Sequence, residues 1–339
     1  MYKNICTLFL LCSVLQCIAA QELIDLEKNL QDFVLETKQI IIPEFPGAFN
    51  ASIVRWQDSL LMCFRVRDNN SISTFEFGFV WLDDDFNPIS TSKILQIYGD
   101  PSSYRQNQDA RLIVVKNKLY ILYNNFIKIA EDNVSRRMFI AELHCDKEKF
   151  FIENPTCLQP INKMSKRWEK NWVPFNYNNN LLLAYSLAPH NILNPSLDTG
   201  KCETESSTHS FVNWKWGELR GGTPALLDGD QYIAFFHSST YLATEQSGGK
   251  KMQHYFMGAY TFLPKSPFEI AHISPKPIIG KNFYSGPTYN TRKPLRVVFP
   301  MGCIANEDYI WITYGRQDNE MWVAKLDKKK LYESLIPVT

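Results

Sequence analysis

Five segments of the chain repeat one pattern: a short β-branched or aromatic run, a turn rich in Asn, Asp or Gly, and a second such run. This combination predicts β-hairpins. Repetition on this scale is typical of blades arranged around an axis. We therefore predict an all-β fold, a five-bladed β-propeller over residues 46–339, with a β-sandwich as the alternative. The five hairpins are expected at residues 52–67, 110–123, 171–185, 223–236 and 295–314.

Other segments predict what surrounds these hairpins. Residues 75–81, 138–143 and 255–262 have the composition of further strands. Near the N-terminus, apolar residues recur at helical spacing, which predicts a short N-terminal helical arm within residues 21–45. Lys328 to Leu335 is expected to form a terminal helical turn. The residues that set the spacing in the arm are Leu23, Leu26, Leu30 and Phe33.

The first twenty residues have the pattern of a secretory signal peptide. Lys3 provides a positive start, an apolar run follows, and Ala19-Ala20 form a small-residue cleavage site before Gln21. No later stretch is long and apolar enough to cross a bilayer, so no stable membrane insertion is expected. We predict a secreted or extracytoplasmic protein. Three glycosylation sequons, at Asn50, Asn69 and Asn133, are consistent with that prediction.

Charge and cysteine usage exclude several classes of protein. The chain has 36 Lys and Arg against 35 Asp and Glu and no basic block, so nucleic acid is a poor candidate partner. Five cysteines follow the signal peptide, and this odd number implies a free thiol or an intermolecular bond. Cysteine and histidine spacing does not suggest zinc, so we expect neither a metal nor an organic cofactor.

Polar residues concentrate at one end of the predicted hairpins. In an antiparallel hairpin, the residue entering the first strand and the residue leaving the second lie at the same end. If these strands are the innermost of each blade, their open ends surround a central pocket. The polar residues at these positions include Arg65, Arg67, Asp68, Asn107, Asp109, Arg111, Lys170, Asn171, Arg220, His237, Tyr314 and Asp318.

The same segments resemble a known family. Each is short, but together they span nearly the whole mature chain in order. The chain resembles glycoside hydrolase family 130, the β-mannoside phosphorylases and mannosidases, and the related five-bladed mannosyl-transferring enzymes. The matching stretches are Phe64–Asp68, Asn107–Leu112, Lys170–Phe175, Arg220–Pro224, Phe236–His237, Tyr255–Gly258, Val297–Gly302 and Tyr314–Asp318.

The resemblance implies an enzyme that acts on β-mannosidic linkages by hydrolysis, phosphorolysis or mannosyl transfer. Asp109 matches the general acid of the family. The implied partners are a β-mannoside oligosaccharide or glycan and, for the phosphate-dependent reactions, inorganic phosphate or GDP-mannose. The residues expected to bind sugar are Arg65, Asp68, Asn107, Arg111 and Asp318. Those expected to bind an anion are Lys170, Asn171, Arg220, His237 and Tyr255.

Two departures from the family leave the nucleophile open. Tyr185-Ser186-Leu187 stands where phosphorylases carry a second Arg, and Lys170 stands where Arg is usual. The pocket is therefore compatible with inorganic phosphate, with a sugar-nucleotide phosphate, or with water. Hydrolysis also needs a base, for which Glu169 and Glu218 are the candidates, with His237 as an alternative.

Two further points stay open at the level of sequence. A propeller that binds glycans without turnover is the alternative function, because the departures above are what a degraded catalytic set would show. Several tryptophans are candidates either for stacking on sugar rings or for structural packing. They are Trp168, Trp172, Trp214 and Trp216.

Overall fold

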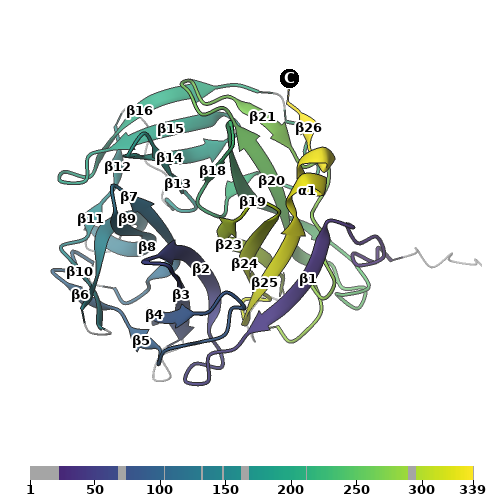
Figure 1. Ribbon diagram of the computed structural model, residues 1–339, viewed down its shortest axis with the longest axis horizontal. Helices are drawn as coiled ribbons and strands as arrows, with labels where there is room; N and C mark the ends of the chain where they lie inside the picture. The colour runs from purple at the N-terminus through teal and green to yellow at the C-terminus, as the bar shows by residue number, and fades with distance from the viewer. Residues whose placement is uncertain are drawn as a thin grey trace, which may run out of the picture.

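The computed structural model describes most of the chain and shows an all-β protein with a β-propeller arrangement (Figure 1). Within the described part, the strands form five hydrogen-bonded sheets and one short helix is present. The innermost strands of neighbouring sheets contact one another in a closed ring around a central channel. The described residues are 23–67, 74–102, 104–130, 133–146, 149–161, 168–210, 212–288 and 295–338.

Each sheet begins at the channel with one of the predicted hairpins and continues outward mainly by antiparallel pairing, with β6 (Gln96–Tyr98), β12 (Gln159–Pro160) and β22 (Leu295–Arg296) added in parallel. The first contains β2 (Phe49–Trp56), β3 (Ser59–Arg67), β4 (Phe75–Leu82) and β5 (Lys93–Ile94). The second contains β7 (Gln108–Val115), β8 (Lys118–Ala130), β9 (Asn133–Asp146), β10 (Lys149–Glu153), β6 (Gln96–Tyr98) and β11 (Thr156–Cys157). The third contains β13 (Val173–Tyr177), β14 (Asn180–Leu187), β15 (His190–Pro195), β16 (Lys201–Thr208) and β12 (Gln159–Pro160).

The last two sheets bring together segments that are far apart in the chain. The fourth contains β17 (Arg220–Gly221), β18 (Leu226–Asp228), β19 (Gln231–Leu242), β20 (Met252–Phe262), β21 (Ile270–Ile273), β22 (Leu295–Arg296) and β26 (Ile336–Pro337). The fifth contains β23 (Val298–Ala305), β24 (Tyr309–Arg316), β25 (Glu320–Asp327) and β1 (Val34–Ile40). The helix α1 (Lys328–Ser334) follows β25, which confirms the terminal helical turn expected there.

The predicted helical arm at the N-terminus is wrong. Residues 34–40 form β1, which pairs antiparallel with the edge strand β25, as Figure 1 shows beside the C-terminal strands. Leu26 and Phe33 are buried in the core, whereas Leu23 and Leu30 are exposed. The strand is favoured because β25 offers its unpaired backbone groups to a second strand. Helical spacing alone did not reveal this long-range partner.

Hydrophobic side chains fill the space between neighbouring sheets. Leu61 and Phe77 of the first sheet pack against Tyr123 and Phe139 of the second, and the Phe77 and Tyr123 rings meet edge to face at 5.5 Å. Cys63, Cys202 and Cys303 are buried free thiols in these cores, in line with the free thiol expected from the odd cysteine count. The sheets are thereby fixed relative to the channel.

The hairpin turns lie together at one end of the channel. The turns at Gln57-Asp58, Lys116-Asn117 and Asn178-Asn179 each have positive φ at both central residues. That backbone matches the twist of the adjoining strands and favours Asn, Asp and Gly. The turns occur where the sequence predicted them, so the open ends of the same hairpins lie at the opposite end. None of the helices in the described ranges has the length and apolar character needed to cross a membrane.

Candidate active site

Several of the polar residues predicted to surround a pocket lie close together at the open ends of the hairpins, but Tyr314 does not, because it is buried in the hydrophobic core and its ring packs against Phe283. Asp109 enters β7 with a positive φ of 56°, next to a register shift between Gln108 and Arg111. A β-bulge of this kind redirects a side chain out of the regular alternation. Asn50 has a similar φ of 53° at a register shift in β2, and its amide donates to Asp109 Oδ1 at 3.4 Å.

Asp109 is a buried carboxylate among cations. Its residue is 7% exposed, and Arg65 Nη1 lies 3.7 Å from Asp109 Oδ1. Burial alone would raise the pKa of the Asp109 carboxyl, but four nearby cations together hold that pKa below its ordinary value. Asp109 is therefore ionised at neutral pH. The four cations are Arg65, Arg111, Lys170 and Arg136.

Arg65 is held in place mainly by aromatic rings. Its guanidinium lies 3.7 Å from the centre of the Phe75 ring and 4.8 Å from that of Phe49. Neighbouring Arg67 lies over Phe49 as well and donates to the backbone carbonyl of Asp318. These contacts fix Arg65 beside Asp109 and join the first and fifth sheets at the site.

Asp318 is a second carboxyl in the same charge cluster. Burial raises the pKa of Asp318, while Arg65 opposes that change and Asp109 adds to it. The two carboxyls thus experience opposite net effects, with Asp109 the more readily ionised. Asn107 is buried nearby, where its side-chain oxygen accepts from Asn125 at 2.9 Å.

Arg111 belongs to the wall of the site. It is 0% exposed, and its guanidinium donates to the carbonyls of Gly222 at 2.5 Å, Asp109 at 3.0 Å and Gly221 at 3.4 Å. Burial lowers the pKa of Arg111 to about 10, and Asp109 opposes that change. Arg111 was expected to bind sugar, but these contacts make it a positioning residue that ties β7 to β17.

His237 forms part of the wall on the fourth sheet. Its Nδ1 lies 3.0 Å from the Gly221 carbonyl, and a nitrogen facing a carbonyl carries the proton, which leaves Nε2 as the acceptor. Burial lowers the pKa of His237 well below 6.5, and Lys170 adds to this effect, so the ring is neutral at pH 7. Tyr255 stacks on the imidazole with ring centres 6.0 Å apart.

Lys170, Asn171 and Arg220 line one cavity of about 400 Å³ beside this centre. Desolvation lowers the pKa of the Lys170 ammonium, while Asp109 opposes the change. Asn171 has a positive φ of 65°, and its buried Oδ1 has no hydrogen-bond partner among the described residues. The Gly221 backbone approaches so closely that a Cβ there would lie 2.2 Å from the Asn171 carbonyl oxygen, so only glycine fits.

The two glutamates proposed as bases lie on the same cavity but have different surroundings. Glu169 is buried, and Tyr185 donates to its Oε1 at 3.3 Å. Glu218 is exposed and accepts from Arg220 Nε at 3.1 Å and Nη2 at 2.7 Å. Asp68 lies outside the described residues.

Sequence reasoning missed Arg136. Arg136 lies on β9, the third strand from the channel, opposite Phe126 of β8. Most of the predicted site residues belong to the two inner strands of the hairpins or to their ends. It is buried, donates to Asn124 at 2.5 Å, and lies 3.9 Å from the centre of the Phe126 ring. Burial lowers the pKa of Arg136 to about 10, with Asp109 opposing. The local sequence contains no signal for this role, because the neighbours of Arg136 in the chain are Ser135 and Arg137 and its aromatic contact, Phe126, is ten residues away.

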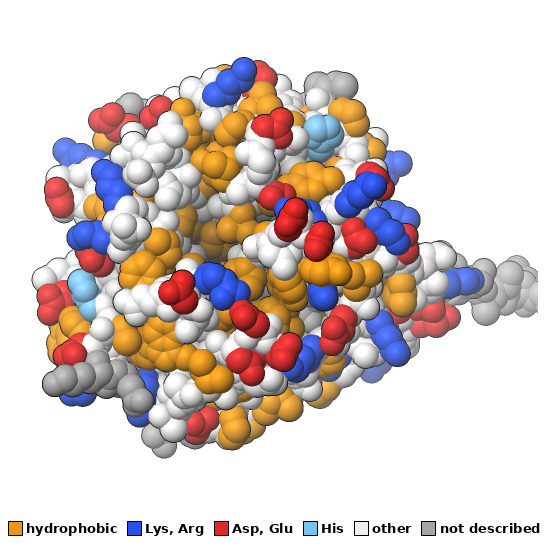
Figure 2. Space-filling model, viewed as in Figure 1, with side chains coloured by type: hydrophobic (Ala, Val, Ile, Leu, Met, Phe, Trp, Pro, Cys, Tyr) orange, Lys and Arg blue, Asp and Glu red, His pale blue; other side chains and the backbone are white. Residues whose placement is uncertain are grey.

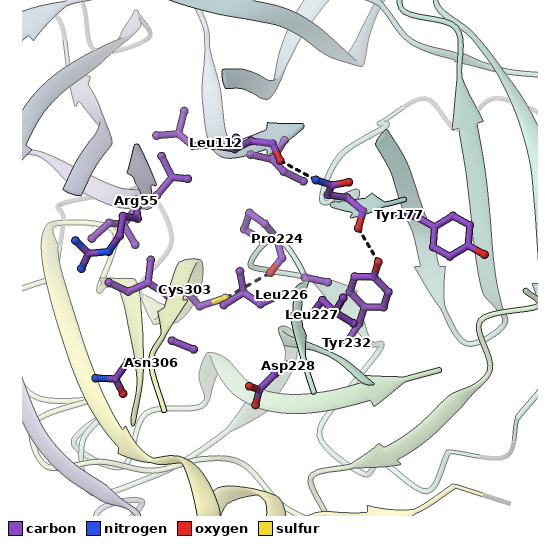
Figure 3. Close-up of a pocket in the computed structure, with 18 of the residues that line it drawn as sticks. Arg55, Leu112, Tyr177, Pro224, Leu226, Leu227, Asp228, Tyr232, Cys303 and Asn306 are labelled. Atoms are coloured by element: carbon purple, nitrogen blue, oxygen red, sulfur yellow. Dashed lines mark hydrogen bonds between the residues drawn. The ribbon is translucent and has the colours of Figure 1, made fainter. Parts of the chain in front are cut away.

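The turn end of the channel contains a larger cavity, of about 860 Å³, shown in Figure 3. Figure 2 shows a hollow near the middle of one face, with hydrophobic side chains inside it and charged ones around it. Around the cavity of Figure 3, the Tyr232 hydroxyl donates to the Asn176 carbonyl at 2.6 Å. Asp228 pairs with Lys328 at 2.9 Å. No group of metal-binding side chains occurs anywhere in the part of the chain that the structure describes.

Comparison by sequence finds mannosyl-transferring relatives. No family model matches the chain. "Beta-mannosyltransferase 3" of Komagataella phaffii is 30% identical over 134 residues, which are 37% of this chain and 20% of that protein. The chain thus spans only about a fifth of the length of the curated relatives that it matches.

Comparison by structure finds the same group. A mannose phosphorylase from Leishmania mexicana, solved with a phosphate ion, has a TM-score of 0.61 at 14% identity and covers 89% of this chain and 92% of its own. A β-1,2-mannobiose phosphorylase from Listeria innocua, solved with β-1,2-mannobiose, has a TM-score of 0.58 at 13% identity over 91% and 94%. The expected resemblance is confirmed.

A GDP-Man-dependent mannosyltransferase from Leishmania mexicana has the same fold. Its TM-score is 0.59 at 12% identity, and the match covers 88% of this chain and 91% of that chain. Identity at this level establishes the fold that these proteins share with the chain. The site residues must therefore carry the argument for function.

Proposed function

We propose that the protein is a β-mannoside-active enzyme that transfers a mannosyl group between a sugar and a phosphate-bearing group. One observation carries this proposal: Asp109 is a buried carboxylate with Arg65 3.7 Å away and further cations around it. A carboxylate suits proton transfer to or from a sugar hydroxyl. Clustered cations suit a phosphate.

The charge state of Asp109 defines its role in the forward and reverse directions of mannosyl transfer. When a mannosyl group is transferred to an acceptor, Asp109 takes the proton of the acceptor hydroxyl as the oxygen bonds to the anomeric carbon. The bond from that carbon to the phosphate oxygen breaks, and the electron pair leaves with the phosphate. In the reverse direction phosphate attacks, and Asp109 returns the proton as the general acid expected from the sequence.

The other residues divide between sugar and phosphate. Arg65, Asp318 and Asn107 are proposed to hold sugar hydroxyls, together with Asp68, which the structure does not describe. Lys170, Asn171, Arg220, His237 and Tyr255 are proposed to surround the phosphate. Water is the less favoured nucleophile, because Glu218 is already paired with Arg220 and Glu169 accepts from Tyr185.

The finer points of architecture and location are also proposals. Each of the five sheets is taken as one blade, because the inner strands contact one another in a closed ring. Since β1 (Val34–Ile40) is part of the fifth sheet, the propeller begins before residue 46, where the sequence analysis placed its start. Secretion is supported by the signal-peptide pattern of residues 1–20. N-terminal sequencing of the mature protein tests secretion, and the sequence is expected to begin at Gln21.

The structure also distinguishes between the glycosylation sequons. Asn50 is buried beside Asp109, so the sequon at Asn133, which is exposed, is the better glycosylation site.

The direct test supplies the reaction partners. Purified protein is incubated with β-mannooligosaccharides alone, with added inorganic phosphate, and with GDP-mannose, and the products are identified by mass spectrometry. Mannosyl phosphate or a lengthened oligosaccharide is expected only when a phosphate compound is present. Binding without any product under all three conditions would instead establish a non-catalytic glycan-binding propeller.

Asp109→Asn tests the proton carrier. Turnover is expected to fall by about 10²–10⁴-fold because a neutral amide cannot exchange the proton, while sugar binding persists. Glu307→Gln is the matched control, since Glu307 is an exposed residue at the turn end of the channel. Equal turnover in Asp109→Asn and wild type would remove Asp109 from the reaction.

A further inference from the structure

A groove runs outward from the cation side of the site. It consists of the cavity of about 400 Å³ beside Lys170 and Arg220 and a second cavity of about 530 Å³. The two adjoin, because Tyr185, Ser186, Glu218 and Leu219 line both. We call this pair of cavities the lateral groove. It lies between the open ends of the third and fourth sheets.

The lateral groove begins at the cations and not at the catalytic carboxylate. The described residues lining its inner part include Lys170, Asn171 and Arg220, but not Asp109, Arg65 or Asp318. A sugar acceptor has to present its hydroxyl to Asp109. A group attached to the phosphate has to leave the channel past Lys170 and Arg220. The groove therefore begins where a group attached to the phosphate would lie, and not where a sugar acceptor would lie.

The walls offer flat aromatic surface and polar groups, among them the carboxylates of Glu169 and Glu218, of which Glu218 is paired with Arg220. Trp168 is 50% exposed at the inner cavity. Trp214 lines the outer cavity and is fixed there, because its Nε1 donates to Ser238 Oγ at 2.8 Å and its ring packs against Phe236. Asn171 is 6% exposed, and its Oδ1 has no partner among the described residues. A buried acceptor without a partner is costly unless a ligand supplies a donor.

We propose that the lateral groove holds the nucleoside of a nucleoside diphosphate whose phosphates lie at Lys170 and Arg220. This inference rests on the proposed function and narrows its phosphate-bearing group to a sugar-nucleotide donor. A base stacks on an aromatic face such as Trp168, and ribose hydroxyls and base edges supply donors of the kind that Asn171 Oδ1 lacks. The combined cavities are of the size that small-molecule sites have. Inorganic phosphate alone would leave the groove without a ligand.

The test compares ligands that differ only in the nucleoside. Isothermal titration measures the affinities of wild-type protein for GDP, UDP, inorganic phosphate and β-mannotriose. At least one nucleoside diphosphate is expected to bind about tenfold or more tightly than phosphate, because stacking of one base contributes about that much. Equal affinities for phosphate and both nucleoside diphosphates would overturn the inference.

Variants of the groove make the test specific. Trp168→Ala is expected to remove most of the advantage of the nucleoside diphosphate while the affinity for phosphate stays the same, and Trp168→Phe to restore part of it. Tyr98→Ala is the matched control, because Tyr98 is an equally exposed aromatic residue, at 52%, on the distant strand β6. If Trp168→Ala weakened β-mannotriose binding and left GDP and UDP unaffected, the groove would be an acceptor site and the inference would be wrong.

The two proposals can fail separately. Phosphate-dependent turnover of β-mannosides with no preference for a nucleoside diphosphate would contradict the lateral-groove inference alone. Absence of turnover with every phosphate compound would contradict the proposed function, and the inference with it.

Discussion

The two ends of the central channel are made from the same hairpins but differ in chemistry. At the turn end lies the larger cavity, about 860 Å³, and charged residues there are paired with one another, as Asp228 is with Lys328. At the open end the spaces are smaller, but unlike charges converge on Asp109. Cavity size therefore does not locate the chemistry here. Convergence of buried charge is the observation on which the proposed site rests.

Backbone geometry explains the difference. At the turn end, positive φ values occur at paired turn residues such as Lys116 and Asn117, where they close a tight hairpin. At the open end, Asn50, Asp109 and Asn171 have positive φ as single residues where the chain enters or approaches an inner strand, although Gln317 and Asp318 form a positive-φ pair there as well. The first pattern serves folding. The second directs polar side chains toward the channel and leaves them without a regular strand pairing.

The largest expected difference concerns two arginines, one at each end of the inner hairpins. Arg111 at the open end is fully buried and donates to three carbonyls, whereas Arg55 at the turn end forms an exposed pair with Asp84. Arg111→Met is expected to lower the free energy of unfolding by about 3 kcal/mol, because it removes the guanidinium that donates to the buried carbonyls of Gly222 and Asp109. Arg55→Met should cost less than about 1 kcal/mol. Urea denaturation measures both.

Comparison of the unfolding free energies of these two variants tests whether the buried charges at the open end contribute to the stability of the fold. Similar losses of stability in the two variants would mean that Arg111 contributes no more than an exposed ion pair. A loss confined to Arg111→Met would support its assignment as a wall residue that holds β17 against β7.

A smaller effect is expected from pH. Because the folded protein keeps His237 neutral and the unfolded chain protonates it below pH 6.5, stability is present above that pH and is lost as the pH falls. Between pH 7 and pH 5 this residue should remove about 2 kcal/mol. His237→Gln, which cannot titrate, is expected to show a shallower decline in unfolding free energy than wild type.

The control for this measurement is His209→Gln, which replaces an exposed histidine directly after β16. It should follow the wild-type pH profile. If His237→Gln followed it too, burial of a neutral imidazole at the open end would not contribute to acid sensitivity.

Some features of the two ends could be predicted from the sequence, and others could not. Hairpins and turns were predictable because Asn, Asp and Gly at turns and apolar runs in strands are local signals. Asp109 and Arg65 were predictable because the order of strands places hairpin ends together. Strand β1 was not, because it depends on β25, nearly three hundred residues away in the chain. Arg136 was not, because its reach to Asp109 depends on how β8 and β9 extend past the inner strand.

The smallest predicted effect is a change in stability at the turn of Lys116 and Asn117, where relief of backbone strain should leave turnover unchanged. Lys116 and Asn117 have φ values of 50° and 57°, a backbone that Asn-Gly adopts more readily than Lys-Asn. The double change Lys116→Asn with Asn117→Gly is expected to raise the unfolding free energy by about 0.5–1 kcal/mol and leave turnover unchanged. Asn50→Gly relieves the same kind of strain at the open end, but it removes the amide that donates to Asp109, so turnover should fall. Unchanged turnover in Asn50→Gly would show that the left-handed residues at both ends serve folding alone.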